Sequence, residues 1–276
     1  MQRDDDHKGL AHHLGVMTAA MDRRRLLRLL GAASLVPLVG CGGGDDDDTA
    51  GVDSGNSGAD SGEGGACTVI PQETAGPYPG DGSNGPDALA LDGIVRSDIR
   101  SSVGDASGTA EGVPLTVTLT LVDTGASCAP LAGYAIYIWH CDRSGNYSMY
   151  TGDAVGENYL RGVQETDSDG VVTFATIFPG CYSGRWPHIH FEVYPSLAAA
   201  ASGSSVANTS QLALPEDVCA EVYTAAGYEA SVGNLSQISL TSDNVFSDDG
   251  GVKQIAAVTG SVAAGYTASL TVGSAG

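Results

Sequence analysis

The chain has 276 residues, of which 33 are acidic and 12 are basic, and its formal net charge is −21. Beyond Cys41 only six basic residues face 29 acidic ones, and a surface of this sign repels phosphate backbones and anionic lipid headgroups. The composition therefore argues against nucleic acid or a charged membrane surface as partners, and it says little about a small substrate.

Residues 1–41 are predicted to form an export signal. A twin-arginine motif, DRRRLLR, begins at Asp22, and an apolar run too short to span a membrane follows it. The lipobox LVGC ends at Cys41, so we expect Cys41 to be lipidated and to become the mature N-terminus. Met21 is an alternative start, in which case residues 1–20 are not translated.

Residues 42–66 are predicted to be a disordered tether. They are mostly Gly, Asp and Ser, with four consecutive aspartates, and such a segment has nothing to bury. Signal and tether together predict an exported protein. It would be a membrane-anchored lipoprotein, or a periplasmic or extracellular protein, that meets the membrane only through its lipid anchor.

The folded domain is predicted to cover residues 67–276 and to open with an irregular arm, rich in Pro and Gly, over residues 68–80. Alternating polarity and β-branched side chains predict strands further along the chain. We place these strands at residues 115–121, 134–140, 171–177, 188–194, 235–240, 253–259 and 266–272.

Two stretches between these strands, residues 151–165 and residues 197–209, are predicted to be loops because they are rich in small and polar residues. Pro215 is typical of a first helical position, and it opens the one expected helix, about residues 215–226. Many short strands, Gly-rich turns and one short helix predict an all-β fold, an antiparallel β-sandwich.

Five cysteines follow the lipobox, and an odd number leaves at least one of them free in an oxidising compartment. They are Cys67, Cys128, Cys141, Cys181 and Cys219. Their spacing matches no zinc-binding pattern. Cys128 and Cys141 flank one turn and one strand, so we expect a disulfide between these two.

The strand at 188–194 carries the clearest functional pattern. Its alternation places His188 and His190 on one face, where both imidazoles can reach one transition-metal ion. The mature chain has only one further histidine, His140. By itself the pair also fits a polar strand face with two solvated imidazoles.

Two tyrosines lie in Gly-containing loops beside this strand: Tyr147, after the strand at 134–140, and Tyr182, six residues before His188. Loop tyrosines are ordinarily surface or half-buried aromatics. If they converge on the histidines, their phenolate oxygens are hard, anionic donors, and a set of two histidines and two tyrosines selects Fe(III) over zinc or Fe(II). A copper or zinc site on the histidine pair is the weaker alternative.

Five segments of the domain resemble the intradiol ring-cleaving catechol and protocatechuate dioxygenases, most closely their exported single-domain members. These segments are ETAGPY at 73–78, WHCDRSGNYS at 139–148, LRGVQ at 160–164, FPGCYSGR at 178–185 and PHIHF at 187–191. The resemblance runs from about Cys67 to the C-terminus. The helical N-terminal domain through which the cytoplasmic members dimerise is missing, so the oligomeric state stays open.

The resemblance implies a non-haem Fe(III) ion in a β-sandwich, held by Tyr147, Tyr182, His188 and His190. Tyr182 would be the axial ligand that leaves when substrate binds and accepts one of its protons, and His188 would lie opposite. Tyr147 and His190 would be equatorial.

Three further residues match positions around the substrate in that family. Arg185 corresponds to the arginine that steadies negative charge on the substrate. Gln237 resembles a glutamine that lies just outside the iron ligands, and Tyr78 is a candidate for the same surroundings or for substrate contact.

The resemblance therefore predicts an oxidoreductase, an Fe(III)-dependent intradiol dioxygenase in aromatic compound catabolism. It would use both atoms of O2 to open the ring of a small aromatic diol of catechol type to a cis,cis-muconate-type product. The alternative is a non-catalytic surface lipoprotein that keeps the β-sandwich for binding. Which catechol is the substrate stays open.

Overall fold

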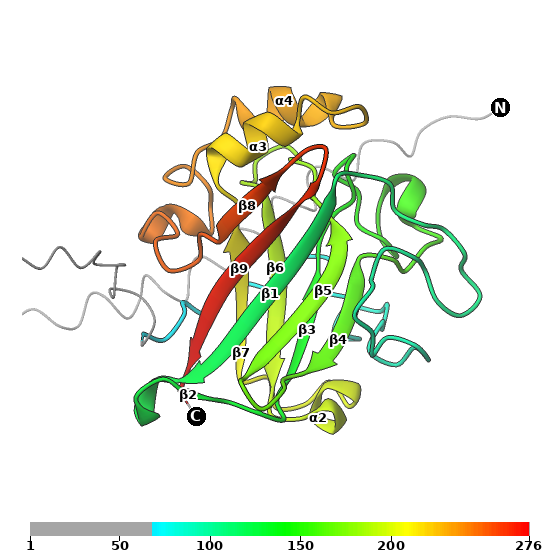
Figure 1. The fold of residues 1–276 in the computed structure, drawn as a ribbon. Coiled ribbons are helices and arrows are strands. Elements are labelled where there is room, and N and C mark those ends of the chain that lie inside the picture. Colours follow the sequence, from blue (N-terminus) through cyan, green and yellow to red (C-terminus); the bar gives the residue numbers. More distant parts are fainter. Residues whose placement is uncertain (1–67, 276) are drawn as a thin grey trace, which may run out of the picture. The chain divides into compact units, whose positions relative to one another are not determined.

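The structure, a computed structural model, describes residues 68–275 (Figure 1). The predicted export signal with Cys41, the tether at 42–66 and Cys67 lie outside the described residues. Within the described part of the chain, none of the helices combines the length and the apolar character needed to cross a membrane.

Two β-sheets form the framework of the described chain (Figure 1). The larger has the order β2-β1-β9-β8, and β5 also pairs with β1. Its strands are β1 (Pro114–Asp123), β2 (Ala129–Pro130), β5 (Val171–Ile177), β8 (Ala257–Ser261) and β9 (Gly265–Ser274). The smaller sheet has the order β4-β3-β6-β7 and contains β3 (Ala135–Trp139), β4 (Arg161–Glu165), β6 (His188–Tyr194) and β7 (Asn208–Ala213).

Neighbouring strands in both sheets are antiparallel, with the exception of the parallel pair β1 and β9. The predicted mostly-β, antiparallel class is therefore confirmed. The strands β5 and β6 have the predicted bounds, and β1, β3, β8 and β9 overlap their predicted ranges.

Side chains of both sheets meet in one hydrophobic core. Val117 and Phe174 enter it from the larger sheet, and Ile138 and Phe191 enter it from the smaller one. The strand β6 is buried along its whole length. Because side chains alternate along a strand, its histidines face away from this core, toward the other side of the smaller sheet.

The other side of the smaller sheet is covered by a second apolar cluster. Tyr137 and Trp139 of β3 pack there with Ala88 and Ile94, which belong to the segment before β1. Water is therefore kept from both faces of β6, and polar side chains on its outer face lie in a desolvated environment.

The prediction of a single helix is wrong, because the described residues contain three short α-helices. They are α2 (Leu197–Ala201), α3 (Glu216–Val222) and α4 (Glu229–Leu235), with 3-10 turns η2 (Thr124–Ala126), η3 (Gly152–Ala154) and η4 (Phe246–Asp248). The predicted helix corresponds to α3, but Pro215 is its N-cap and not its first helical residue, and the helix ends at Val222. Ser196 caps α2 by accepting a hydrogen bond from the Ala199 N–H. The strand predicted at 235–240 is also wrong, since the end of α4 and a turn occupy it.

Two largely polar strands were not predicted: β4 lies within the loop predicted at 151–165, and β7 begins at the end of the loop predicted at 197–209. The strand β4 pairs with β3, and β7 pairs with β6, both antiparallel. All six residues of β7 are buried despite the sequence NTSQLA. Composition underestimates such strands because their polar side chains find partners in the fold, such as the bond from Thr209 Oγ1 to Glu192.

The predicted Cys128–Cys141 disulfide is wrong. Cys141, Cys181 and Cys219 are buried free thiols, and Cys128 is disulfide-bonded. Its partner is therefore none of the other described cysteines. The two predicted partners lie beside different sheets. Cys128 directly precedes β2, whereas Cys141 follows β3 and has its Sγ 3.4 Å from the carbonyl oxygen of Gly180.

His140 connects the two sheets from the end of β3. Its Nε2 lies 2.7 Å from Thr176 Oγ1 on β5, and its Nδ1 lies 2.8 Å from the Cys141 carbonyl oxygen. Burial lowers the pKa of His140 to about 4, so its imidazole is neutral around neutral pH.

We expect His140 to make the protein less stable in acid. The unfolded chain binds a proton at this histidine near pH 6.5, whereas the folded chain binds it only near pH 4. The stability that comes from the neutral His140 is therefore fully present above about pH 6.5 and is lost as the pH falls toward 4. The full effect corresponds to roughly 3 kcal/mol of unfolding free energy. Urea unfolding at about pH 7 and about pH 4.5 measures it. The unfolding free energy of His140→Gln should depend less on pH than that of the wild type. An equal pH dependence would show that His140 is not the cause.

Candidate metal centre

The outer face of β6 brings the two predicted histidines together. The Nε2 atoms of His188 and His190 lie 3.0 Å apart, and both side chains are buried. Trp139, the residue opposite His190 on β3, stacks on the His190 ring with centroids 4.8 Å apart and 6° between the planes. The sheet therefore fixes both the position and the plane of this imidazole.

The two predicted tyrosines reach the same point from two loops. The hydroxyl oxygens of Tyr147 and Tyr182 lie 3.3 Å and 3.4 Å from His188 Nε2, and 3.5 Å from each other. Four side chains that are as much as 43 positions apart in the sequence thus converge on a single point.

A shared turn sets the spacing of the two tyrosine loops. Asp142 accepts two backbone hydrogen bonds through its side chain within the turn that precedes Tyr147, and its carbonyl oxygen accepts one from the Gly180 N–H. A Cβ atom at Gly180 would lie 2.6 Å from the Arg143 carbonyl oxygen, so only glycine permits this approach. The turn therefore holds Tyr147 next to the loop that carries Tyr182.

Burial favours the neutral form of all four side chains. It lowers the pKa of His188 to about 3 and that of His190 well below its ordinary value. It raises the pKa of Tyr182 to about 12 and that of Tyr147 well above its ordinary value. The Nδ1–H of His188 donates to the Trp186 carbonyl oxygen, which leaves the Nε2 lone pair directed at the cluster.

The spacing of the four donor atoms fits one shared cation. Bonds of about 2.0–2.2 Å from an ion to nitrogen or oxygen place neighbouring ligand atoms roughly 3.0–3.5 Å apart. The contacts among these four side chains span 3.0–3.5 Å. Within residues 68–275 no group of three or more His, Cys, Asp or Glu side chains could hold a metal ion. Two phenol oxygens make this site suited to a hard, highly charged ion.

Arg185 brings a positive charge to the edge of the cluster. Its Nη1 lies 3.5 Å from His188 Nε2, and its side chain is only 12% exposed. Its Nε donates to Asp243 at 2.9 Å, and its Nη2 donates to Gln211 Oε1 at 2.6 Å. The guanidinium can therefore act on negative charge that enters the site.

Gln237 does not lie at this site, contrary to the prediction. It is exposed in the turn after α4, and its Nε2 donates to the carbonyl oxygen of Gly233 within that helix. The glutamine that the fold places here is Gln211 on β7, which is buried and lies opposite His190 in the strand register. Gln211 was not predicted because β7 starts at the end of a stretch predicted as a surface loop.

The predicted arm at 68–80 is irregular and lies against the site. The Tyr78 ring contacts the Tyr147 ring with centroids 5.1 Å apart. The buried Arg161 of β4 donates to the carbonyl oxygens of Tyr78 and Pro79 at 3.0 Å and 2.7 Å. A guanidinium held by backbone carbonyls thus fixes this part of the arm beside the cluster.

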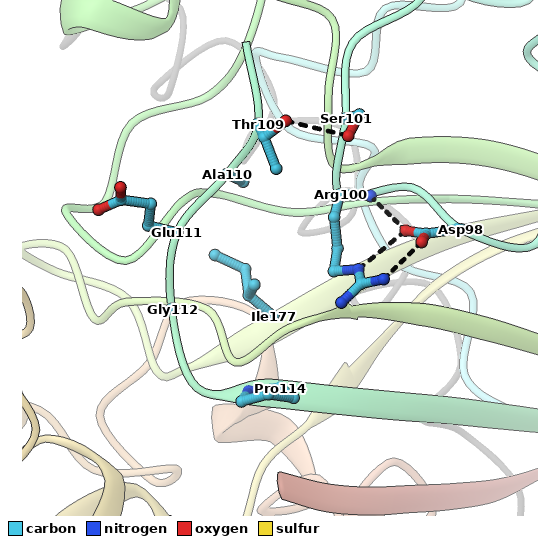
Figure 2. A pocket seen from close by; sticks show the side chains of 9 residues that line it. All are labelled: Asp98, Arg100, Ser101, Thr109, Ala110, Glu111, Gly112, Pro114 and Ile177. Atoms are coloured by element: carbon cyan, nitrogen blue, oxygen red, sulfur yellow. Dashed lines mark hydrogen bonds and ion pairs between the residues drawn. The ribbon is translucent and has the colours of Figure 1, made fainter.

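A separate cavity lies near the start of β1 and contains none of the four clustered side chains (Figure 2). Its charged groups are already paired, since Arg100 contacts Asp98 at 2.6 Å, and Ser101 bonds Thr109 at 3.0 Å. Figure 2 shows these pairs beside the cavity. This arrangement gives no indication of a catalytic or metal-binding site.

Comparisons with known proteins give a matching family model and several similar solved structures. The family model described as Dioxygenase matches residues 95–191, which include all four clustered side chains. An intradiol ring-cleavage dioxygenase from Tetranychus urticae is 29% identical with a TM-score of 0.58, covering 75% of this chain and 95% of that one. The dioxygenase Tetur07g02040 is also 29% identical with a TM-score of 0.58, covering 75% and 94%.

The third is the dioxygenase domain of a dioxygenase carbohydrate-binding protein fusion from Streptomyces sp. SirexAA-E. It is 27% identical with a TM-score of 0.47, and the match covers 75% of this chain and 97% of that one. None of the curated proteins compared with the chain matches it.

Gly76→Ala should disturb His190. Gly76 has φ +71°, where an L side chain costs about 1–2 kcal/mol, and an added Cβ would lie 3.4 Å from His190 Cε1. We expect a loss of unfolding free energy and a shift of the His190 imidazole signals in NMR spectra. Gly104→Ala is the matched control, since it has φ +66° and no atom within 4 Å. Unmoved His190 signals in Gly76→Ala would contradict this contact between arm and site.

Proposed function

We propose a specific reaction for this chain from the premise that it belongs to the intradiol ring-cleavage dioxygenases, oxidoreductases that act on catechol-type substrates with O2. We infer that it opens a catechol-type ring to a cis,cis-muconate-type product with the help of a ferric ion. One observation carries this proposal: His188 Nε2 lies 3.0–3.4 Å from His190 Nε2 and from the hydroxyl oxygens of Tyr147 and Tyr182, in a largely buried place.

The proposed iron ligands are Tyr147, Tyr182, His188 and His190. Two neutral imidazoles and two phenolates neutralise two of the three charges of Fe(III), which leaves one positive charge to attract an anionic diol. A ferric ion in this set would act as a Lewis acid that binds both oxygens of the diol and makes the ring reactive toward O2.

Tyr182 is proposed to be the ligand that leaves and takes up a proton. It is half-buried, whereas Tyr147 is fully buried, so only Tyr182 has room to swing toward solvent. A phenolate released from the ion would be basic enough to take up a catechol hydroxyl proton, because an ordinary tyrosine has a pKa of about 10.

Arg185 is proposed to stabilise negative charge on the substrate oxygens. Its Nη1 is the end of the guanidinium that faces the cluster, and the desolvated surroundings strengthen its electrostatic effect. Gln211 orients this group through its bond to Nη2. Tyr78, packed on Tyr147, is proposed to line the substrate position.

We propose that residues 67–276 form one catalytic domain with a β-sandwich fold, because two sheets share one core. We also retain the exported, lipid-anchored location as a proposal that rests on the twin-arginine motif and the lipobox at Cys41. A wild-type protein that fractionates with membranes and a Cys41→Ser variant that does not would support it. A wild-type protein found only in the soluble fraction would contradict it.

Oxygen uptake tests the proposed reaction. Iron-loaded protein should consume one O2 for each catechol ring opened, because both oxygen atoms enter the product. The panel should include unsubstituted and carboxylated catechols, with hydroquinone as the matched control because its hydroxyls cannot chelate one ion together. Iron-loaded protein that consumes no O2 with any catechol would contradict the proposal.

Tyr147→Phe and His190→Ala should each lose iron and visible colour together. Each side chain supplies one of four bonds to the ion, and a tyrosinate bound to Fe(III) absorbs visible light by charge transfer. Iron content and the visible spectrum after loading measure this loss. Tyr134→Phe is the control, because that tyrosine packs against the core on the other side of the sheet. Full iron content in Tyr147→Phe or His190→Ala would contradict the ligand assignment.

A further inference from the structure

A buried carboxylate from the segment after α4 reaches the arginine of the site. Asp243 is 0% exposed and accepts four hydrogen bonds. Its Oδ2 accepts from Arg185 Nε at 2.9 Å and from the Trp186 N–H at 2.7 Å. Its Oδ1 accepts from the N–H groups of Val245 and Phe246 at 2.8 Å and 3.1 Å.

Such a carboxylate is costly to bury unless it is fully paired. Both of its oxygens have two donors, so Asp243 is satisfied in its ionised form. Burial alone would raise its pKa, but the charge of Arg185 and the backbone donors hold the pKa of Asp243 below its ordinary value. The fold thus maintains a permanent negative charge at this position, 58 residues beyond Arg185.

The bonds to Arg185 leave one end of its guanidinium directed at the cluster. Asp243 holds Nε, and Gln211 holds Nη2, which fixes the plane of the group. Nη1 is the remaining nitrogen, and it lies 3.5 Å from His188 Nε2. Without the bond at Nε, a flexible arginine has many other rotamers in which Nη1 points away from the site.

Asp243 also acts on the backbone beside a proposed ligand. The Trp186 N–H donates to Asp243, and the Trp186 carbonyl oxygen accepts the Nδ1–H of His188. One carboxylate therefore supports both the arginine and the residue that fixes the tautomer of His188.

We propose that Asp243 is a positioning residue of the ring-cleavage site, which holds Arg185 so that its Nη1 faces the substrate. This inference rests on the function proposed above and extends it to a segment that the sequence analysis did not single out. Asp243 does not touch the substrate, and it acts through Arg185.

Asp243→Asn is the first test, in iron-loaded protein. An amide has one acceptor oxygen where the carboxylate has two, so two of the four donors lose their partner in either orientation. We expect kcat for catechol to fall by roughly 10–100-fold, with KM changed by less than about threefold and the visible band retained. An unchanged kcat would overturn the proposal.

A double-mutant cycle shows whether Asp243 acts through Arg185. The kcat of the Asp243→Asn/Arg185→Gln variant should equal that of Arg185→Gln alone within about twofold. Independent, multiplicative losses would overturn the proposal. Asp248→Asn is the matched control, an exposed aspartate in the same segment, and it should keep the kcat of the wild type.

Thermal unfolding of the same variants supplies a readout that needs no turnover. Each single variant leaves one buried group without its charged partner and the double variant leaves none, so the Tm loss of the double variant should be smaller than the sum of the single losses. If the Tm losses are additive and the wild type is active, the proposed role of Asp243 is wrong while the proposed function stands. Absence of ring cleavage by the wild type would instead overturn the proposed function, and with it the catalytic part of this inference.

Discussion

The structure is organised around the two imidazole nitrogens and two phenol oxygens that are proposed to bind the metal, which are crowded together in a largely buried place. His188 Nε2 lies 3.0–3.4 Å from His190 Nε2 and from both phenol oxygens, and the two phenol oxygens are 3.5 Å apart. Burial favours the neutral forms of all four side chains. A polar cluster of this kind is expensive to desolvate unless something shared by all its members offsets that cost. The trivalent cation proposed above would do so, because it would convert the phenols to phenolates and use the imidazole lone pairs.

Each neighbouring element fixes one feature of this cluster, such as a spacing or the plane of a ring. The register of β6 against β3 sets the spacing of the histidines, and the stacked Trp139 fixes the plane of His190. The Asp142 turn keeps the two tyrosine loops at a constant distance. Arg161 and Asp243, both buried, hold the arm and Arg185 in place. Site precision therefore comes from rigid sheet positions combined with loops that are tied down by buried hydrogen bonds.

The proposed ligands could be predicted from the sequence because two independent patterns agree on them. Strict alternation identified β6 with its bounds, and the scarcity of histidine drew attention to His188 and His190. The polar strand β7 could not be predicted in the same way, because its polar residues are buried by partners far away in the sequence. Gln211 was missed for that reason, and the exposed Gln237 was chosen instead. Asp243 gave no local signal, since its importance depends on an arginine 58 residues earlier. The wrong Cys128–Cys141 pairing has the same origin, because closeness in sequence does not show that two cysteines lie beside different sheets.

Anomalous diffraction at the iron edge, from crystals of the iron-loaded protein, tests the central claim most directly, because it locates the ion without reference to activity. We expect one strong peak about 2.0–2.2 Å from the phenol oxygens of Tyr147 and Tyr182 and from the Nε2 atoms of His188 and His190. A peak held by the two histidines alone, or an iron site elsewhere in the molecule, would contradict the shared four-ligand centre on which the proposed reaction depends.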